Sequence, residues 1–383
     1  MPLTFPPFDL TRLLRTVFDP APGERIGVLI DLPDPREVRD LAFLQDMDRK
    51  VQRKAYEVIV RGLREKTMAD LGLTGGDLFA YRTTGGSNLD LPDEAWTPDG
   101  RQVSLERDVY PAYHLVLAIT DYSATAPLTA SAKLHGFRGA TLHGLNDIIL
   151  GTGLAVDYVE VSAQAETLRL ALTRADWFEI DYEVLGRKLT LRLVIDGQEA
   201  QKSHGLCRER KPDVANLPAG EVYFVPPGAE GQFPLPYEDG TIGIMTVAGG
   251  RIVDAEFLSG DPATVEAHKA RLAADPVTGE IGELGFGTQE LPWAWHDIQD
   301  EKILGTVHVA TGRSDHLGGA LTPDKFTDRG HATHDDILFA PHKTPDIAVP
   351  EVRMRRDGQT VVTHANYQPA PYLLQALGRP AAH

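Results

Sequence analysis

The pattern of apolar residues changes near the middle of this chain, and this change limits the folds that it can adopt. In the first half, continuous apolar runs at residues 25–31 and 114–120 are separated by helical segments. A strand, helix, strand order is typical of a parallel sheet covered by helices. From Glu179 onward, polar and apolar residues alternate as far as an Asp-Gly pair at 196–197. That alternation indicates antiparallel strands joined by tight turns.

We therefore expect two domains and an α+β protein overall. Residues 1–185 are predicted to form an α/β domain. Residues 186–383 are predicted to form a mostly β catalytic domain, either a sheet or a partly closed barrel, with a helix over 262–274. In the first domain, the spacing predicts helices over residues 10–18 and 37–70, and a loop and a helix over 131–146.

The charge balance excludes several classes of partner. Acidic residues number 55 and basic residues 38, which gives a formal net charge of -17. A surface this acidic repels nucleic acids and anionic membranes, so neither is expected as a partner. The N-terminus lacks the basic start of a secretory signal, and no apolar run approaches the ~18 residues of a membrane span. We expect a cytoplasmic protein.

The segment that follows residue 282 concentrates histidines and carboxylates. His334 and Asp336 lie two residues apart before an apolar run, so in a strand both side chains face the same way. Asp335 then faces the opposite side, and it becomes the competing ligand if the backbone is not extended. Imidazole and carboxylate groups on one face are typical of a divalent-metal site.

Three further residues extend this candidate site. His308 closes another strand pattern, and Glu283 lies between apolar residues and glycines, where an unpaired carboxylate is costly to bury. Glu221 begins a strand after a Pro and Gly turn. Glu301 is predicted to be a solvated surface residue, with an extra catalytic acid as the alternative. The charges of two divalent ions are balanced by three carboxylates and one bridging hydroxide, and such an ion pair activates water.

The motifs around Glu221, Glu283, His308 and His334–Asp336 resemble, in order and spacing, the metal-ligand motifs of the thermophilic metallo-aminopeptidases, the aminopeptidase T family. The resemblance implies a metal-dependent hydrolase that releases N-terminal amino acids from peptides or cleaves small amides, and a homodimer. It also implies two divalent ions, Zn, Co, Mn or Mg, held by Glu221, Glu283, His308, His334 and Asp336, with Glu283 or Asp336 as the bridge.

The same resemblance leaves the catalytic groups and the reaction open. The family has a tyrosine after its Gly-Thr-x-His strand, which this chain lacks, so Arg313 or His316 is expected to stabilise the oxyanion. Glu221 is expected to take part in catalysis as well as in metal binding. An alternative function is that of the dihydroxypyridine ring-opening dioxygenases, whose fold is similar; His308, His334 and Asp336 then form a mononuclear Fe(II) site. A relative without peptidase activity is a further alternative.

Overall fold

The computed structural model of this protein describes residues 3–380 and divides into two compact units. The first unit takes in the chain up to Ser162, His204–Ala219 and Leu291–Gln299. The second takes in Ala163–Ser203, Gly220–Glu290 and the chain from Asp300 onward. The boundary near residue 185 stays a prediction. Several sheets and many helices are present, so the protein is α+β overall, as predicted.

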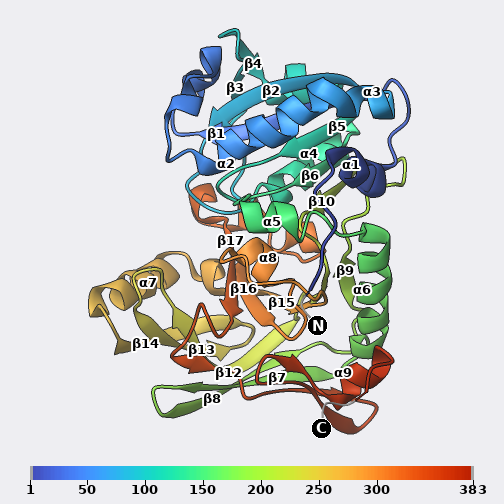
Figure 1. Cartoon of the computed structure of the whole chain (residues 1–383). Coiled ribbons are helices and arrows are strands. Elements are labelled where there is room, and N and C mark those ends of the chain that lie inside the picture. The colour runs from blue at the N-terminus through green and yellow to red at the C-terminus, as the bar shows by residue number, and fades with distance from the viewer. Residues whose placement is uncertain (1–2, 381–383) are drawn as a thin grey trace. The chain divides into compact units, whose positions relative to one another are not determined.

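The first unit is built on a seven-stranded sheet (Figure 1). Its strand order is β10-β6-β5-β1-β2-β3-β4, and the five strands from β10 to β2 run parallel. The strands are β1 (Arg25–Leu32), β2 (Thr74–Arg82), β3 (Glu94–Trp96), β4 (Gln102–Ser104), β5 (Leu115–Ala118), β6 (Arg138–Thr141) and β10 (Asp213–Asn216).

Helices cover both faces of the parallel strands. Val28 of β1 belongs to the apolar cluster that contains Leu14, whereas Leu29 of the same strand belongs to the cluster that contains Leu128. A strand that is buried on both faces must be apolar along its whole length, which explains the continuous run. The helical segments up to residue 172 are α1 (Leu10–Phe18), η1 (Pro35–Gln45), α2 (Lys50–Lys54), η2 (Ala55–Val60), η3 (Leu63–Thr67), α3 (Met68–Leu71), η4 (Leu105–Val109), η5 (Tyr110–Ala112), α4 (Thr125–His135), α5 (Asp147–Gly151) and α6 (Tyr158–Leu172).

Two sequence predictions in this unit need correction. The helix expected over residues 37–70 is interrupted, because the Asp46 side chain accepts the Asp48 N–H at 2.9 Å and forms a turn. The segment 131–146, expected as a loop and a helix, contains the end of α4 and the strand β6. Arg138 and Gly139 made the β6 run look too polar and too flexible for a central strand.

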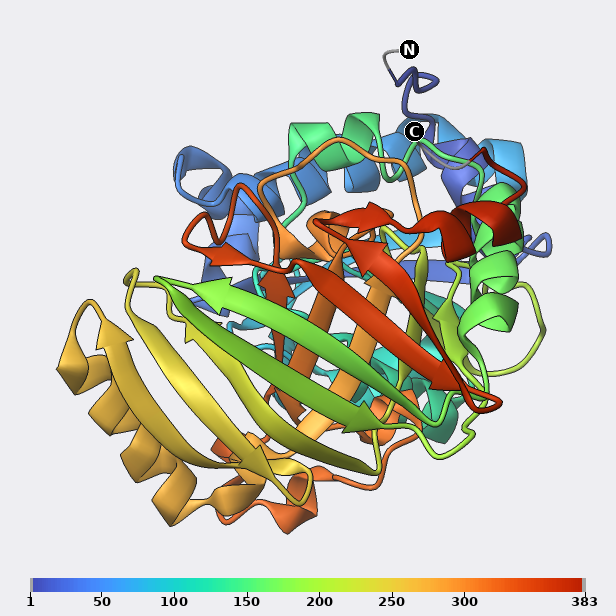
Figure 2. The same ribbon diagram turned by 90° about the horizontal axis from the view of Figure 1, so that it is seen from below.

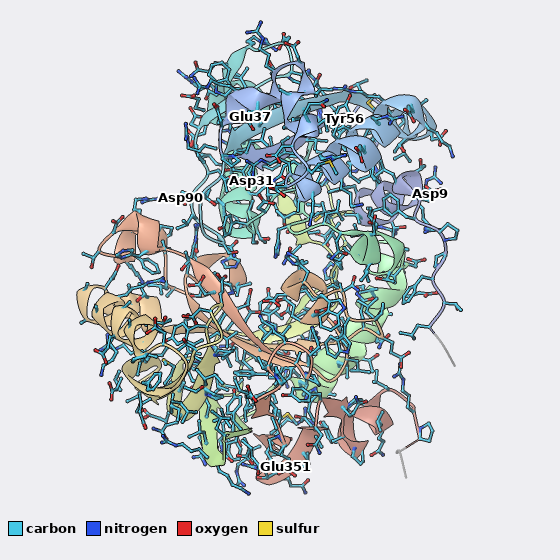
Figure 3. All side chains as sticks on the ribbon, turned by 60° about the vertical axis from the view of Figure 1, so that its left-hand side comes forward. Asp9, Asp31, Glu37, Tyr56, Asp90 and Glu351 are labelled. Carbon is cyan, nitrogen blue, oxygen red and sulfur yellow. The ribbon has the colours of Figure 1, made fainter. Side chains whose placement is uncertain are left out.

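A buried carboxylate lies near the end of β1. Asp31, labelled in Figure 3, accepts hydrogen bonds at 2.9 Å from the Gln52 side chain and from the Asp121 N–H. Burial raises the pKa of Asp31, and the nearby Asp121 charge adds to the effect, so the pKa reaches about 6.

The second unit contains two antiparallel sheets. One has the order β14-β13-β12-β8-β7-β19-β20-β21, with β18 paired to β7, and it is seen face-on in Figure 2. Its strands are β7 (Trp177–Val184), β8 (Arg187–Val194), β12 (Gly228–Pro236), β13 (Ile242–Ala248), β14 (Arg251–Ser259), β18 (Ile347–Ala348), β19 (Glu351–Arg356), β20 (Gln359–Ala365) and β21 (Gln368–Pro369).

The other sheet has the order β17-β16-β15-β11-β9. Its strands are β9 (Gln201–Ser203), β11 (Glu221–Phe224), β15 (Ile281–Gly287), β16 (Val307–Gly312) and β17 (His334–Phe339). The remaining helical segments are α7 (Pro262–Ala274), η6 (Pro276–Gly279), α8 (Asp297–Asp300), η7 (Asp315–Leu317), η8 (Pro323–Lys325), η9 (Arg329–His331) and α9 (Pro371–Ala376).

The two sheets of the second unit share one apolar core. The Phe178 ring lies 5.2 Å from the Phe286 ring, and the Tyr182 ring lies 4.8 Å from the Phe339 ring. Across residues 3–380 these sheets stay open, so the partly closed barrel is not formed. None of the helices in that range combines the length and the apolarity needed to cross a bilayer.

Candidate metal centre

The five-stranded sheet has one apolar face and one face with ionisable groups. Val222, Leu284 and Val309 belong to the apolar core. Residues at the alternate positions of the same strands point to the other face. The structure therefore brings together the side chains of all five predicted ligands, Glu221, Glu283, His308, His334 and Asp336.

Small residues leave the space that this cluster occupies. Gly285 of β15 pairs with His308 of β16, and Ala310 lies between Glu283 and Asp336 in neighbouring strands. A Cβ atom at Gly285 would lie 2.1 Å from His308 Cε1 and 2.6 Å from Glu221 Oε1. The glycine in the Glu-Leu-Gly-Phe-Gly motif therefore gives the imidazole its place over the sheet.

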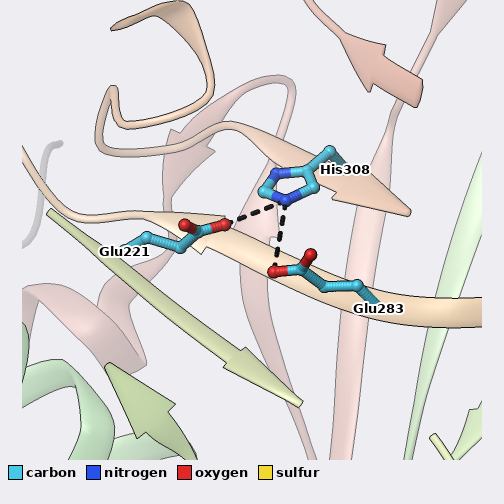
Figure 4. Close-up of side chains that lie close together, drawn as sticks. All are labelled: Glu221, Glu283 and His308. Atoms are coloured by element: carbon cyan, nitrogen blue, oxygen red, sulfur yellow. Dashed lines mark ion pairs between the residues drawn. The ribbon is translucent and has the colours of Figure 1, made fainter. Parts of the chain in front are cut away.

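Glu283 lies between the two histidines. Its Oε2 is 2.9 Å from His334 Nε2, and its Oε1 is 3.7 Å from His308 Nε2. Glu221 Oε1 lies 2.9 Å from the same His308 nitrogen, and Figure 4 shows the three side chains converging. Ligand atoms within 4.8 Å of one another define three overlapping groups, Glu221–Glu283–His308, Glu283–His334–Asp336 and Glu301–His308–Asp336.

The cluster attracts positive charge strongly. Burial lowers the pKa of His308, but Glu221 and Glu283 outweigh it and raise that pKa well above its usual range. Asp336 and Glu283 raise the pKa of His334 in the same way. Burial acts to raise the pKa of Glu283, yet hydrogen bonds to both histidines hold it at about 2. Carboxylates this dense favour bound cations, whether protons or a metal ion.

Asp336 lies close enough to each of the two histidines to share a metal ion with it. Asp336 Oδ1 is 3.2 Å from His334 Nε2 and 3.9 Å from His308 Nε2. Donors that share one ion through bonds of about 2.1 Å lie about 3 to 4.2 Å apart. Within residues 3–380, this buried oxygen has no hydrogen-bond donor. His334 Nδ1 donates to the Arg313 carbonyl at 2.6 Å, which leaves Nε2 as the ligand atom.

Asp335 lies apart from the cluster, as expected for an extended backbone. Its side chain accepts from Thr333 Oγ1 at 2.7 Å and lies 3.7 Å from Arg271. The strand β17 therefore presents Asp336 to the cluster and Asp335 to the opposite face.

Glu301 is not the solvated residue that the sequence suggested. It is 4 % exposed, and its Oε1 lies 2.6 Å from Lys302 Nζ. Burial raises the pKa of Glu301, and although Lys302 opposes the shift, the pKa reaches about 7. A short polar stretch looks solvated in the sequence, but backbone hydrogen bonds from Thr288 and Gln289 to the Lys302 carbonyl hold it inside.

Lys302 is the site residue that sequence reasoning missed. Its side chain is 1 % exposed, and Nζ lies 2.5 Å from Glu221 Oε2. Burial lowers the pKa of Lys302, but Glu221 and Glu301 outweigh it and raise the pKa, so the ammonium stays charged. The only signal in the sequence was a lysine directly before the apolar pair Ile303-Leu304.

His316 and Arg313 lie on the segment that follows β16. The His316 ring is 4.9 Å from the His334 ring and borders a cavity of about 900 Å³, which Tyr223, Ser314 and Gly319 also line. Burial, reinforced by His334, lowers the pKa of His316 well below its usual range, so this imidazole is neutral. The Arg313 guanidinium pairs with Asp315 at 2.6 Å.

Two other histidines of the segment that follows residue 282 lie against carboxylates outside the candidate site. His331 Nδ1 is 3.0 Å from Asp275, and His342 Nε2 is 2.9 Å from Asp300. These contacts do not involve the five predicted ligands.

Comparison with known proteins bears on the fold. No protein-family model and no curated protein matches this chain. The structure is similar to that of 2,5-dihydroxypyridine dioxygenase from Pseudomonas putida KT2440, with a TM-score of 0.60. The two share 14% sequence identity over 94% of this chain and 97% of that chain. Similarity at this level establishes a shared fold.

This finding overturns the expected aminopeptidase family and the hydrolase that it implied. The matching fold is that of an oxidoreductase, and nothing supports peptide or amide cleavage by this chain. The metal-ligand motifs led to the wrong reaction because they identify the residues that can bind a metal and not the chemistry that the metal supports. A Gly-Glu, a strand histidine and a His-x-Asp place donors on one sheet face in a hydrolase and in an oxygenase alike. The oxyanion role of Arg313 and His316 is withdrawn with the hydrolase.

Proposed function

We propose that this protein is a mononuclear Fe(II)-dependent dioxygenase that opens a hydroxylated aromatic or heteroaromatic ring. The observation that supports it most is the approach of His308 and His334 to one oxygen of Asp336, at 3.9 and 3.2 Å. Two imidazoles and one carboxylate are the ligand set of non-haem Fe(II) oxygenases, which leaves open positions on the metal. The similar fold of a dihydroxypyridine dioxygenase favours the same chemistry.

When bound, Fe(II) would supply the binding and activation of dioxygen. The protein's own groups would hold the ligands and handle the substrate. The Arg313 carbonyl accepts from His334 Nδ1 and orients that ring, and Glu283 lies beside both His334 and His308. The neutral His316 ring, between His334 and the cavity, is placed to accept a proton from a ring hydroxyl of the substrate.

Oxygen consumption tests this proposal. Metal-free protein would be loaded anaerobically with Fe(II) and mixed with 2,5-dihydroxypyridine and a panel of dihydroxylated rings. We expect one dioxygen consumed for each ring opened, and loss of activity in His334→Ala. The variant His331→Ala is a control from the same segment outside the cluster, and it should stay active. Iron-loaded protein that consumes no oxygen with any member of the panel would contradict the proposal.

A further inference from the structure

Lys302 lies at one end of the metal-binding cluster, where a second cation would otherwise be expected. The donors form three overlapping groups, Glu221–Glu283–His308, Glu301–His308–Asp336 and Glu283–His334–Asp336, and this arrangement could hold two ions. One group ends at Glu221, and the Lys302 ammonium lies 2.5 Å from that carboxylate. A second group contains Glu301, which Lys302 also contacts, whereas Lys302 has no hydrogen bond or ion pair with any member of the third, Glu283–His334–Asp336, within residues 3–380.

The Lys302 ammonium contacts two carboxylates. Besides Glu221 Oε2, it contacts Glu301 Oε1 at 2.6 Å. The other oxygen of Glu221 faces His308 Nε2 at 2.9 Å, so both oxygens of this carboxylate already have a partner. An ion that used Glu221 and Glu301 together would have to displace the ammonium.

Hydrogen bonds hold the backbone of Glu301 and Lys302 in place. The Lys302 carbonyl accepts from Thr288 N at 3.0 Å and from Gln289 N at 2.8 Å, and the Glu301 carbonyl accepts from Thr306 Oγ1 at 3.0 Å. The side chain is 1 % exposed, so the ammonium is shielded from solvent. Moving a buried charge out of its carboxylate pair is strongly unfavourable.

We infer that Lys302 serves as a built-in cation, which takes the second cation position and restricts the centre to one divalent ion near His308, His334 and Asp336. The inference rests on the metal centre of the proposed function and explains why the centre is mononuclear. Lys302 is thus a positioning residue, because it acts through Glu221 and Glu301 rather than on the substrate.

Metal stoichiometry tests the inference without any use of activity. Wild type and the variants Lys302→Met, Lys302→Arg and Lys188→Met would be loaded with excess Mn(II), desalted and analysed for metal content. We expect one ion in wild type, in Lys302→Arg, which keeps the charge, and in Lys188→Met, which changes an exposed lysine. Lys302→Met should bind two ions and give the electron paramagnetic resonance spectrum of a coupled Mn(II) pair.

Several outcomes would overturn the inference. Two ions in wild type would do so directly, even if Lys302→Met proved unable to fold. One ion in a folded Lys302→Met would do so as well. The failure of the proposed function looks different: wild type that binds one ion and consumes no oxygen leaves the inference standing. Wild type that binds no divalent ion contradicts both.

Discussion

Gly285 and His308 lie opposite each other in β15 and β16, and a Cβ atom at position 285 would come within 2.1 Å of the imidazole. The ring is surrounded by Glu221, Glu283 and Asp336, so it cannot retreat without breaking those contacts. The room for the candidate metal centre therefore depends on the absence of a side chain at position 285.

Gly285→Ala should weaken metal binding while the protein still folds, because the added Cβ meets only side-chain atoms, those of His308 and Glu221. Displacement of a ligand by this contact should lower the metal affinity about 10- to 100-fold. Titration with Co(II), followed by its visible absorption, measures the affinity. Gly228→Ala, whose added Cβ would meet its first neighbour at 3.7 Å, is the matched control and should bind normally. Equal affinities in the two variants would refute the steric argument.

The neighbours Asp335 and Asp336 should differ sharply when each is changed to asparagine. Asp336→Asn removes the charge of a carboxylate that both histidines approach, so we expect loss of bound metal. Asp335→Asn changes a carboxylate that contacts Thr333 and Arg271 on the other face, and metal content should stay at the wild-type level. Elemental analysis of the two purified proteins decides. Loss of metal in both would mean that β17 does not separate the two side chains.

The stability of the metal-free protein should depend on pH through its two clustered histidines. Their pKa values are raised in the folded state, so their stabilisation is complete below about 6.5 and is lost as pH rises through the raised values. Glu283 has a pKa of about 2 against an ordinary 4.5. Its ionised form stabilises the folded state, and this stabilisation is lost as pH falls through that range.

Thermal unfolding between pH 5 and pH 9 measures this dependence. We expect the Tm of metal-free protein to fall above about pH 7, and the Tm of metal-loaded protein to fall less, because the ion replaces the protons. A metal-free His308→Ala, His334→Ala double variant is the control, and its Tm should vary less over the same pH range. A Tm of wild-type protein that rises with pH would contradict the assignment.

His316 should matter for the reaction and not for the metal. His316→Ala removes the neutral imidazole beside the cavity, so kcat/KM with a dihydroxylated ring should fall about 100-fold while metal content stays unchanged. A flatter pH profile of kcat/KM in the variant would distinguish lost proton transfer from lost packing. Loss of bound metal in His316→Ala would assign the residue a structural role in the centre.

Asp31→Asn should stabilise the protein at neutral pH. The folded-state pKa of about 6 lies above the ordinary value of 3.8, so the ionised carboxylate costs stability above about pH 6. Asparagine keeps the oxygen that accepts from Gln52 and from the Asp121 N–H. We expect a gain of about 1 to 3 kcal/mol at pH 8, shrinking toward pH 4. Urea unfolding at both pH values measures it, and an equal gain at both would exclude the charge as the cause.

Much of the fold follows from local patterns. The helices at residues 10–18 and 262–274 and the strands that begin with Glu221 and His334 lie where apolar spacing predicts them, because the spacing records which face is buried. The sequence did not predict the interruption of the helix near Asp46 or the strand β6. A side-chain turn and a polar run in a central strand both depend on tertiary context.

Local sequence patterns predicted which ionisable side chains gather on one sheet face. Strand periodicity placed His334 and Asp336 on one face, and the resemblance to metal-ligand motifs added Glu221, Glu283 and His308; their role as ligands stays a prediction. Only the tertiary structure decided what surrounds them. Glu301 and Lys302 are buried because backbone hydrogen bonds from Thr288 and Gln289 hold their segment in place. The contact between Lys302 and Glu221, which lie far apart in the sequence, leaves no local pattern. The overall fold, likewise visible only in three dimensions, overturned the hydrolase, because identical ligands serve different reactions.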